Sequence, residues 1–149
     1  MKKSNSMKTI LLEIITPGRK AFSEQVNAVT VPTREGIIGV LPRHIRLFSA
    51  LTEGEVKITY GRKEWFLAIG GGFMEVTRDR ISILVSRAVH ADEINESELK
   101  KAQINAKNIV TQKGKIEERA TALASLRRSF LELKVLHHHK HRQNPTLSS

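Results

Sequence analysis

Short stretches in which apolar and polar residues alternate fill the chain up to about residue 90. Alternation with a period of two is typical of β-strands that bury one face. Turn residues close several of these stretches, as Pro17-Gly18 closes the first. Because at least six short strands follow one another without an intervening helix, we predict an antiparallel β-sandwich or barrel. The predicted strands cover residues 9–16, 26–32, 37–41, 56–60, 65–69 and 81–85.

One stretch differs from the others because three glycines interrupt it. Apolar residues alternate from Trp65 to Ile69, and an apolar pattern resumes at Phe73 after Gly70-Gly71-Gly72. A run of glycines inside a strand marks a bend, a bulge or a close approach of two backbones. A phosphate-binding loop would instead need the glycines to open a helix, and Phe-Met-Glu-Val follows them here. We therefore predict a bent strand that continues to Val76.

The pattern changes to helical spacing after Ile94. Asn95 is a suitable N-cap, and Glu96 and Glu98 fit the first turn of a helix. Two apolar stripes follow with a break at Gly114 between them, which predicts an antiparallel helical hairpin. The first stripe consists of Leu99, Ala102, Ala106 and Ile109, and the second of Ile116, Leu123, Leu126, Phe130 and Leu133.

These patterns predict an α+β protein in two parts. An antiparallel β-sandwich domain is expected over residues 7–92, and an α-helical hairpin over residues 95–136. Residues 137–149 are polar and end in Asn-Pro-Thr-Leu-Ser-Ser, so we expect a disordered tail there.

Composition narrows the class of protein further. The chain has 149 residues and no cysteine, which excludes a disulfide framework, a thiolate zinc site and a cysteine nucleophile. No apolar run is long enough to span a bilayer, so we expect a soluble chain. The formal net charge is +10, and residues 96–149 carry eleven Lys or Arg against five Glu. This excess in the last third indicates an acidic partner for the helices.

No group of residues predicts a catalytic site, so we do not expect an enzyme. His44 follows Pro42 in a loop without a nucleophile or carboxylate to complete a catalytic set, and an interface role fits it better. The glutamates at the two helix starts are explained by the helix macrodipole. Four histidines near the C-terminus are expected to be weak, adventitious metal ligands at most: His137, His138, His139 and His141.

Two local motifs and the order of the elements carry a resemblance to a known family. Residues 36–44, Gly-Ile-Ile-Gly-Val-Leu-Pro-Arg-His, are similar to a Gly-x-x-Gly-Ile-Leu-Pro-Gly-His segment. Residues 71–76, Gly-Gly-Phe-Met-Glu-Val, are similar to a Gly-Gly-Phe-x-Glu-Val strand. Together with strands followed by an Ala-rich hairpin, they resemble the epsilon subunit of bacterial F-type ATP synthases from about Met7 to Leu136. The resemblance implies a ten-stranded sandwich with a helical hairpin.

The resemblance also implies a function. A member of this family is a non-catalytic subunit of the central stalk that couples proton flow to ATP synthesis. Its partners are the gamma stalk subunit, the c-ring of the membrane sector and the catalytic beta subunits. It needs no nucleic acid, and it lies at the cytoplasmic side of the cell membrane as a peripheral protein that meets the membrane only indirectly.

The implied contact residues lie in two places. Contact with the membrane ring is expected from Ile37, Arg43, His44 and Arg46. The second helix is expected to meet an acidic segment of the catalytic subunits and to restrain ATP hydrolysis, through Arg127, Arg128 and Lys134.

The chain departs from the family pattern at the ring loop and at the start of the first helix. Arg43 stands where the family has Gly, and Arg46 where it has Pro, so this loop is unusually basic. Some members carry an Ile/Leu-Asp-x-x-Arg-Ala nucleotide-binding motif. Here Asn95 and Glu98 replace its Asp and Arg, so we expect neither ATP nor another cofactor to bind.

Two other classes of function fit parts of the sequence. A β-sandwich ligand-binding or carbohydrate-binding module requires an exposed aromatic platform, whereas Tyr60 and Trp65 are predicted to be buried by their strand positions. A nucleic-acid-binding protein could use the basic second helix, although only Phe130 accompanies Arg127 and Arg128. A steep salt dependence of DNA binding would favour the second class.

Overall fold

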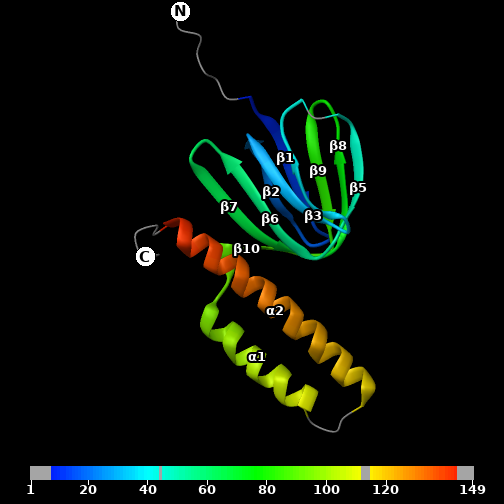
Figure 1. The fold of residues 1–149 in the computed structure, drawn as a ribbon, viewed down its shortest axis with the longest axis vertical. Coiled ribbons are helices and arrows are strands. Elements are labelled where there is room, and N and C mark those ends of the chain that lie inside the picture. Colours follow the sequence, from blue (N-terminus) through cyan, green and yellow to red (C-terminus); the bar gives the residue numbers. More distant parts are fainter. Residues whose placement is uncertain (1–7, 44, 112–114, 144–149) are drawn as a thin grey trace, which may run out of the picture. The chain divides into compact units, whose positions relative to one another are not determined.

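The computed structural model describes residues 8–43, 45–111 and 115–143, which form ten strands followed by helices (Figure 1). The chain divides into two compact units, with the boundary between Val89 and His90. The strands are β1 (Ile10–Ile15), β2 (Lys20–Val26), β3 (Ala28–Thr33), β4 (Gly36–Val40), β5 (Leu47–Leu51), β6 (Gly54–Tyr60), β7 (Lys63–Ile69), β8 (Gly72–Val76), β9 (Arg80–Val85) and β10 (Ala88–His90).

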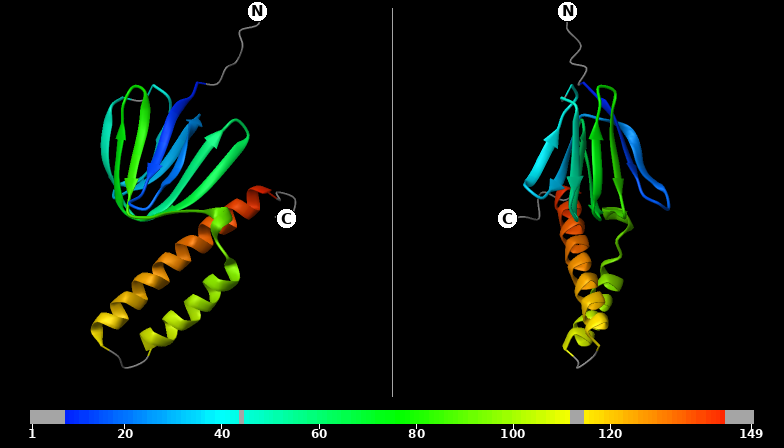
Figure 2. Two further views of the ribbon diagram at one scale, coloured as in Figure 1. Left: turned by 180° about the vertical axis from the view of Figure 1, so that it is seen from behind. Right: turned by 90° about the vertical axis from the view of Figure 1, so that its right-hand side faces the viewer.

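The strands form two five-stranded sheets, which Figure 2 shows from two further directions. Sheet A has the order β2-β1-β9-β8-β5, and sheet B has the order β10-β7-β6-β3-β4. The predicted sandwich and its ten strands are confirmed. One pair departs from the predicted antiparallel arrangement, because β1 and β9 run parallel, with Leu12 opposite Ile81.

The sandwich core consists of the inward-facing residues of both sheets, and the alternation along each strand places them there. Leu12 and Ile83 in sheet A are fully buried, as are Val31, Ile58 and Leu67 in sheet B. Removing each such side chain from water contributes about 1.5–3 kcal/mol. The period-two pattern of the sequence therefore corresponds directly to the core of this unit.

The glycine-interrupted stretch forms two strands in different sheets, so the prediction of one bent strand is wrong. β7 ends at Ile69 in sheet B, and β8 begins at Gly72 in sheet A. The chain between β9 and β10 crosses beside it, and the Gly70 amide donates a hydrogen bond to the Arg87 carbonyl at 2.9 Å. A Cβ on Gly72 would lie 2.7 Å from the Cα of Val85. The glycine run thus marks a close backbone approach, as its composition indicates.

The two aromatic residues that were predicted to be buried differ in their surroundings. Trp65 packs against the core and meets the ring of Phe22 edge-on, with centroids 5.7 Å apart. Tyr60, the last residue of β6, is 46% exposed, so the prediction for it is wrong. A residue at the end of a strand lacks the neighbours that cover the middle of the sheet.

After the 3₁₀ turn η1 (Ala91–Glu93), the second unit forms a hairpin of α1 (Glu96–Thr111) and α2 (Ile116–Gln143). The two helices lie side by side in both figures (Figures 1 and 2). Asn95 caps α1 as predicted, because its Oδ1 accepts a hydrogen bond from the Glu98 amide at 3.2 Å. The expected break at Gly114 lies outside the described residues.

The hairpin seam contains only some of the predicted residues. Ala106 and Leu126 are buried as predicted, whereas Ile116, Leu123 and Phe130, assigned to the seam by their spacing, are 85%, 53% and 52% exposed. Ala102 and Ile109 of the predicted α1 stripe are exposed as well. Apart from Gln103 and Leu126, the buried seam residues are small, so the helices meet through little apolar area. The buried residues that belong to it are Gln103 and Ala106 of α1 and Ala122, Leu126 and Ser129 of α2.

The predicted disordered tail is wrong for residues 137–143, because α2 continues to Gln143. Val135 and Leu136 are buried just before this segment. Lys140 within it forms an ion pair with Glu96 of α1 at 2.7 Å. Lys140, His141 and Arg142 occupy the last turn, where cations interact favourably with the helix dipole. Residues 144–149 lie outside the described part of the chain.

Candidate functional site

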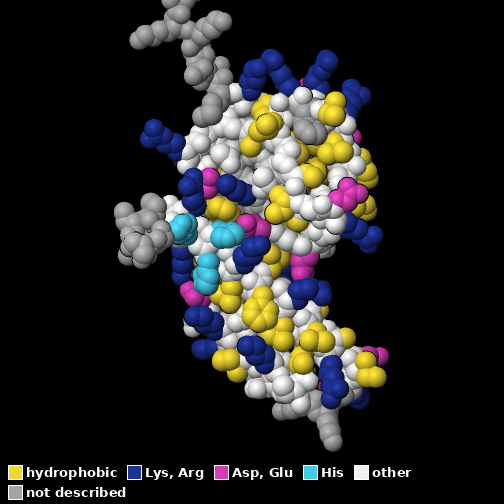
Figure 3. Space-filling model, viewed as in Figure 1, with side chains coloured by type: hydrophobic (Ala, Val, Ile, Leu, Met, Phe, Trp, Pro, Cys, Tyr) yellow, Lys and Arg dark blue, Asp and Glu magenta, His cyan; other side chains and the backbone are white. Residues whose placement is uncertain are grey.

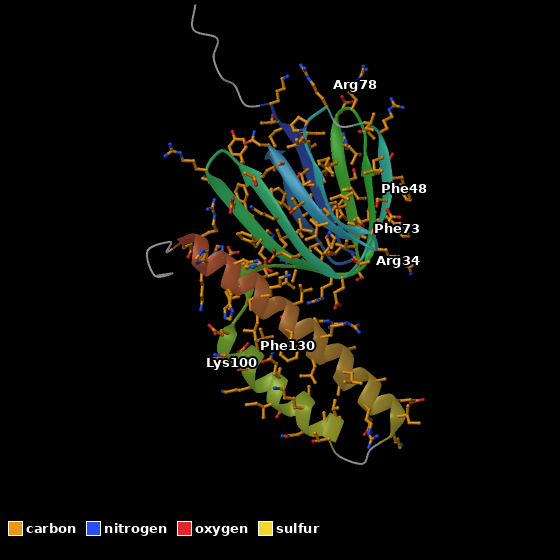
Figure 4. The ribbon with its side chains drawn as sticks, in the orientation of Figure 1. Arg34, Phe48, Phe73, Arg78, Lys100 and Phe130 are labelled. Atoms are coloured by element: carbon orange, nitrogen blue, oxygen red, sulfur yellow. The ribbon has the colours of Figure 1, made fainter. Side chains whose placement is uncertain are left out.

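Two segments that are distant in sequence enclose a hollow at one end of the sandwich. The loop between β4 and β5 supplies Arg43, Ile45 and Arg46, and the turn between β8 and β9 supplies Arg78. They meet because β5 pairs with β8. The hollow has a volume of about 520 Å³, and Figure 4 shows Arg78 at this end. Sequence analysis identified Arg43 and Arg46 but missed Arg78, whose only signal is a position in a charged turn.

Of the other two residues predicted for this contact, Ile37 does not line the hollow. Ile37 is 74% exposed and lies at the start of β4, opposite Pro32 of β3, whereas the loop follows the end of β4. His44 lies outside the described residues. Among the described residues, the structure therefore brings together Arg43 and Arg46 but not Ile37, and it adds Ile45 and Arg78 to them.

The backbone at Arg43 is unusual. Its φ of 67° is the only positive φ of a non-glycine residue in the described part of the chain. This left-handed conformation costs an ordinary L-residue about 1–2 kcal/mol and favours glycine. The resemblance places a glycine at this position, and the observed backbone explains why. In this chain an arginine adopts the left-handed backbone conformation despite that cost.

A second surface lies on the outer face of sheet A. Phe48 and Phe73 are 70% and 52% exposed and stack on each other, with centroids 5.7 Å apart and planes inclined by 20°. Ala50 of β5 lies opposite Phe73, and Leu84 of β9 lies opposite Phe73 on its other side. Figure 4 shows the two aromatic rings along one edge of the sandwich. We call Phe48, Ala50, Phe73 and Leu84 the outer patch.

Sequence analysis missed the outer patch. Phe73 was assigned to the apolar pattern of a buried strand, and Phe48 carried no signal of its own. The two rings meet only because β5 pairs with β8. Contiguous exposed apolar residues of this kind mark a surface that binds another molecule.

A third surface follows α2. Leu123, Arg127, Phe130 and Lys134 share one exposed face at four-three-four spacing. This exposed stripe is shifted by one residue from the seam. Leu123 and Phe130, which were predicted for the seam, therefore lie beside the predicted cationic contacts Arg127 and Lys134. Arg128 is exposed next to it. Figure 3 shows hydrophobic and basic side chains together on the hairpin. Lys107 of α1 adds a cation 5.8 Å from the Phe130 ring centroid.

The hairpin seam contains a polar group that the fold leaves unsatisfied. The Gln103 side chain is buried, and its Nε2 has no hydrogen-bond partner. Leaving a buried donor unpaired costs about 1–3 kcal/mol. Ser129, by contrast, donates to the Leu126 carbonyl within its own helix at 2.8 Å. A seam of small residues with an unpaired amide holds the two helices together only weakly.

One carboxylate joins the two helices at the open end of the hairpin. Glu96 at the start of α1 lies 2.7 Å from Lys140 of α2 and 3.2 Å from Lys100, one turn along α1. His137 Nε2 is 3.9 Å from the same carboxylate. Hydrogen bonds from Lys140 and then Lys100 lower the pKa of Glu96 to about 2. We call this cluster the Glu96 clasp.

The Glu96→Gln substitution is expected to loosen the hairpin at neutral pH. Because the folded-state pKa is lowered, the clasp stabilises the hairpin fully above about pH 4.5, and this contribution is lost as pH falls toward 2. The helical circular dichroism signal of wild type should therefore melt at a higher temperature than that of the variant at pH 7. The gap should close with acid, whereas the matched control Glu98→Gln, which removes a charge from the same first turn without breaking the clasp, should show a smaller gap. A gap that persists at pH 2 would refute the assignment.

The described ranges 8–43, 45–111 and 115–143 contain neither a metal-binding cluster nor a membrane-spanning helix. No group of three or more histidine or acidic residues there could hold a metal ion. The histidines from His137 to His141 lie on the last turns of α2, where His139 contacts Gln143 at 3.0 Å. Neither described helix is long and apolar enough to cross a membrane.

Comparison with known proteins links the sandwich and the hairpin to one family. The family model described as "ATP synthase, Delta/Epsilon chain, beta-sandwich domain" matches residues 9–91. An ATP synthase epsilon chain of Herpetosiphon aurantiacus is 38% identical over 90% of this chain and 98% of its own length. One of Dehalococcoides mccartyi is 37% identical over 93% of this chain and 99% of its own. The similarity therefore extends through both units.

Solved structures show the same fold at lower sequence identity. A chain in the mitochondrial ATP synthase of Euglena gracilis, in a structure of OSCP, F1 and c-ring, aligns with a TM-score of 0.62 at 23% identity. The alignment covers 92% of this chain and 83% of that chain. A chain in the central stalk and c-ring of the Tetrahymena thermophila enzyme aligns with a TM-score of 0.58 at 15% identity, over 87% of this chain and 97% of that one.

Proposed function

This chain belongs to the ATP synthase epsilon chain family, and we propose that it is a non-catalytic subunit of the rotor. In this role it ties the central stalk to the membrane ring, so that torque passes between proton flow and ATP synthesis. The observation that carries the proposal is the match to epsilon chains over nearly the whole length of both chains. A peripheral position at the cytoplasmic side of the cell membrane belongs to the same proposal.

The end of the sandwich at the β4–β5 loop is proposed to face the polar loops of the c-ring. Arg43 and Arg46 are exposed there. His44 belongs to the same loop by sequence. Ile37 would extend the contact along β4, which is an edge strand of sheet B and presents an unpaired backbone edge.

The outer patch is proposed to bind the gamma stalk subunit. Its two stacked phenylalanines offer a rigid apolar surface, and aromatic residues are enriched at the centres of protein interfaces. Charged groups frame the face, because Glu13 of β1 pairs with Lys20 and Arg80 at 3.0 and 3.2 Å. An apolar centre with a polar rim is the usual anatomy of a specific interface.

The hairpin is proposed to restrain ATP hydrolysis by contact with the catalytic beta subunits. The exposed stripe of α2 combines Leu123 and Phe130 with Arg127 and Lys134, and Arg128 lies beside it. This surface fits a partner segment that carries apolar and acidic side chains. The weak seam and the Glu96 clasp support a hairpin that can open, since a switch needs two states of similar free energy.

Association with a gamma-type stalk subunit tests the rotor assignment. Phe73→Ser should weaken that association by at least about tenfold, which corresponds to about 1.4 kcal/mol. Tyr60→Ser is the matched control, because Tyr60 is a similarly exposed aromatic residue of the other sheet. Binding can be measured by titrating the full chain with the purified stalk subunit. Failure of wild type to bind would refute the rotor assignment, and equal effects of both substitutions would refute the outer patch as the site.

A further inference from the structure

The described lining of the hollow at the end of the sandwich is positively charged and contains no carboxylate. Three of the four described lining residues are Arg43, Arg46 and Arg78, and the fourth is Ile45. Within the described part of the chain, none of these arginines forms an ion pair with a carboxylate. Figure 3 shows several basic side chains at this end of the sandwich.

Other arginines of the same unit have partners. Arg80, two residues after Arg78, pairs with Glu13 at 3.2 Å. Arg19 donates to the carbonyl of Ala88 at 3.0 Å. Glu75 lines a neighbouring hollow with Arg46 and forms no ion pair with it. The arginines of the hollow therefore differ from Arg80 and Arg19, whose guanidinium groups have partners within the same domain.

The backbone conformation of Arg43 also indicates that this hollow has a function. Arg43 adopts φ 67°, a conformation in which glycine would be free of strain. Strain that a fold retains at an exposed residue points to a use for that side chain. Here the strained residue is one of the arginines that line the hollow.

We propose that this three-arginine pocket binds a phosphate group. Guanidinium groups are permanently charged forks that bind phosphate and carboxylate oxygens in pairs. A carboxylate offers two oxygens, which one or two guanidinium groups satisfy, whereas a phosphate offers three or four oxygens and a larger charge. Three arginines around one hollow, with no acidic residue in its described lining, match the phosphate better.

The surroundings also suggest what could carry the phosphate. Ile45 is 82% exposed in the lining, and Leu41 of the same loop is 60% exposed. Apolar side chains beside clustered cations suit the headgroup of an anionic phospholipid. Inorganic phosphate offers the same chemistry without the apolar part. The pocket shares Arg43 and Arg46 with the proposed ring contact but does not depend on it, and Arg78 was not among the residues predicted for that contact.

Titration of the isolated full-length chain with inorganic phosphate tests the pocket. Backbone amide signals of the loop 41–46 and the turn 77–79 should shift saturably in NMR spectra, with acetate at equal ionic strength giving a much weaker effect. Arg78→Gln should weaken binding by about tenfold. Arg62→Gln is the matched control, since Arg62 is an exposed arginine in a turn of the same domain outside the pocket.

Co-sedimentation with vesicles of phosphatidylglycerol or phosphatidylcholine identifies the source of the phosphate. Binding to phosphatidylglycerol that Arg78→Gln reduces and Arg62→Gln preserves would assign a lipid headgroup. An Arg78-dependent response to inorganic phosphate alone would assign a free anion. The proposal is overturned if acetate binds as well as phosphate, if the two substitutions act equally, or if neither ligand shows dependence on Arg78.

Discussion

Replacing Arg127, Arg128 and Lys134 together by glutamine is expected to raise ATP hydrolysis by the assembled complex roughly three- to tenfold, which corresponds to about 0.7–1.4 kcal/mol. All three side chains are exposed on α2, so the substitutions remove attraction to an acidic partner without disturbing the seam. Each exposed substitution should change stability by less than about 0.5 kcal/mol. Hydrolysis should be measured at low ionic strength, because salt screens the same attraction.

The control for this variant removes equal charge elsewhere. Arg62, Lys63 and Lys101 are exposed cations outside the α2 stripe, and replacing them by glutamine should leave hydrolysis unchanged. Deleting the chain after Gly114 should reproduce the gain of the triple variant. If only the deletion accelerates hydrolysis, the restraint is steric and the electrostatic account is wrong. If neither does, the hairpin does not restrain hydrolysis in this protein.

Gly72→Ala is expected to destabilise the sandwich by about 1–3 kcal/mol, as overpacking of a closely packed site does. The added Cβ would lie 2.7 Å from the Val85 Cα and 2.9 Å from the Leu84 carbonyl carbon. Both are backbone atoms of β9, so no side chain can rotate away, and the two strands must separate. In a domain of this size such a loss lowers the melting temperature by roughly 5–20 °C.

Gly39→Ala provides the control for this position. Gly39 also lies in a strand, and its Cβ would meet only the Thr30 methyl group at 3.9 Å, an ordinary contact. Thermal unfolding of both variants, followed by circular dichroism, measures the difference. Equal melting temperatures would mean that β8 and β9 can separate at no cost, contrary to the packing described here.

The sandwich could be predicted from sequence because each strand carries its own alternation. The core residues Leu12, Val31 and Ile83 are buried for the same local reason that identified their strands. The change of sheet between β7 and β8 could not be predicted in this way, since alternation does not say which sheet a strand joins. Pairing between distant segments decides it.

The hairpin shows where helical spacing is ambiguous. α2 carries two stripes one residue apart, a small one through Ala122, Leu126 and Ser129 and a larger one through Leu123 and Phe130. The predicted stripe combined Leu123 and Phe130 of the larger stripe with Leu126 of the smaller one, because apolar burial alone favours large side chains. The fold uses the smaller stripe for the seam and leaves the larger one exposed beside basic residues.

The contact sites were predictable only in part. Arg43 and Arg46 were found through a local motif, whereas Arg78 and the outer patch arise from the pairing of β5 with β8. The end of α2 was missed for a similar reason. Its polar composition indicates a tail, and the ion pair between Lys140 and Glu96 is a tertiary contact that composition does not reveal.

The parallel pair β1–β9 has a consequence for how the chain folds during synthesis. β1 is the first strand to leave the ribosome, yet it lies inside sheet A between β2 and β9. β2 can pair with it at once as a hairpin, but its other edge must wait until β9 emerges, when nearly the whole domain has been made. Contacts of such long range slow folding, and an unpaired strand edge invites association with other chains. The nascent subunit therefore exposes an unpaired strand edge from the emergence of β1 until β9 has left the ribosome.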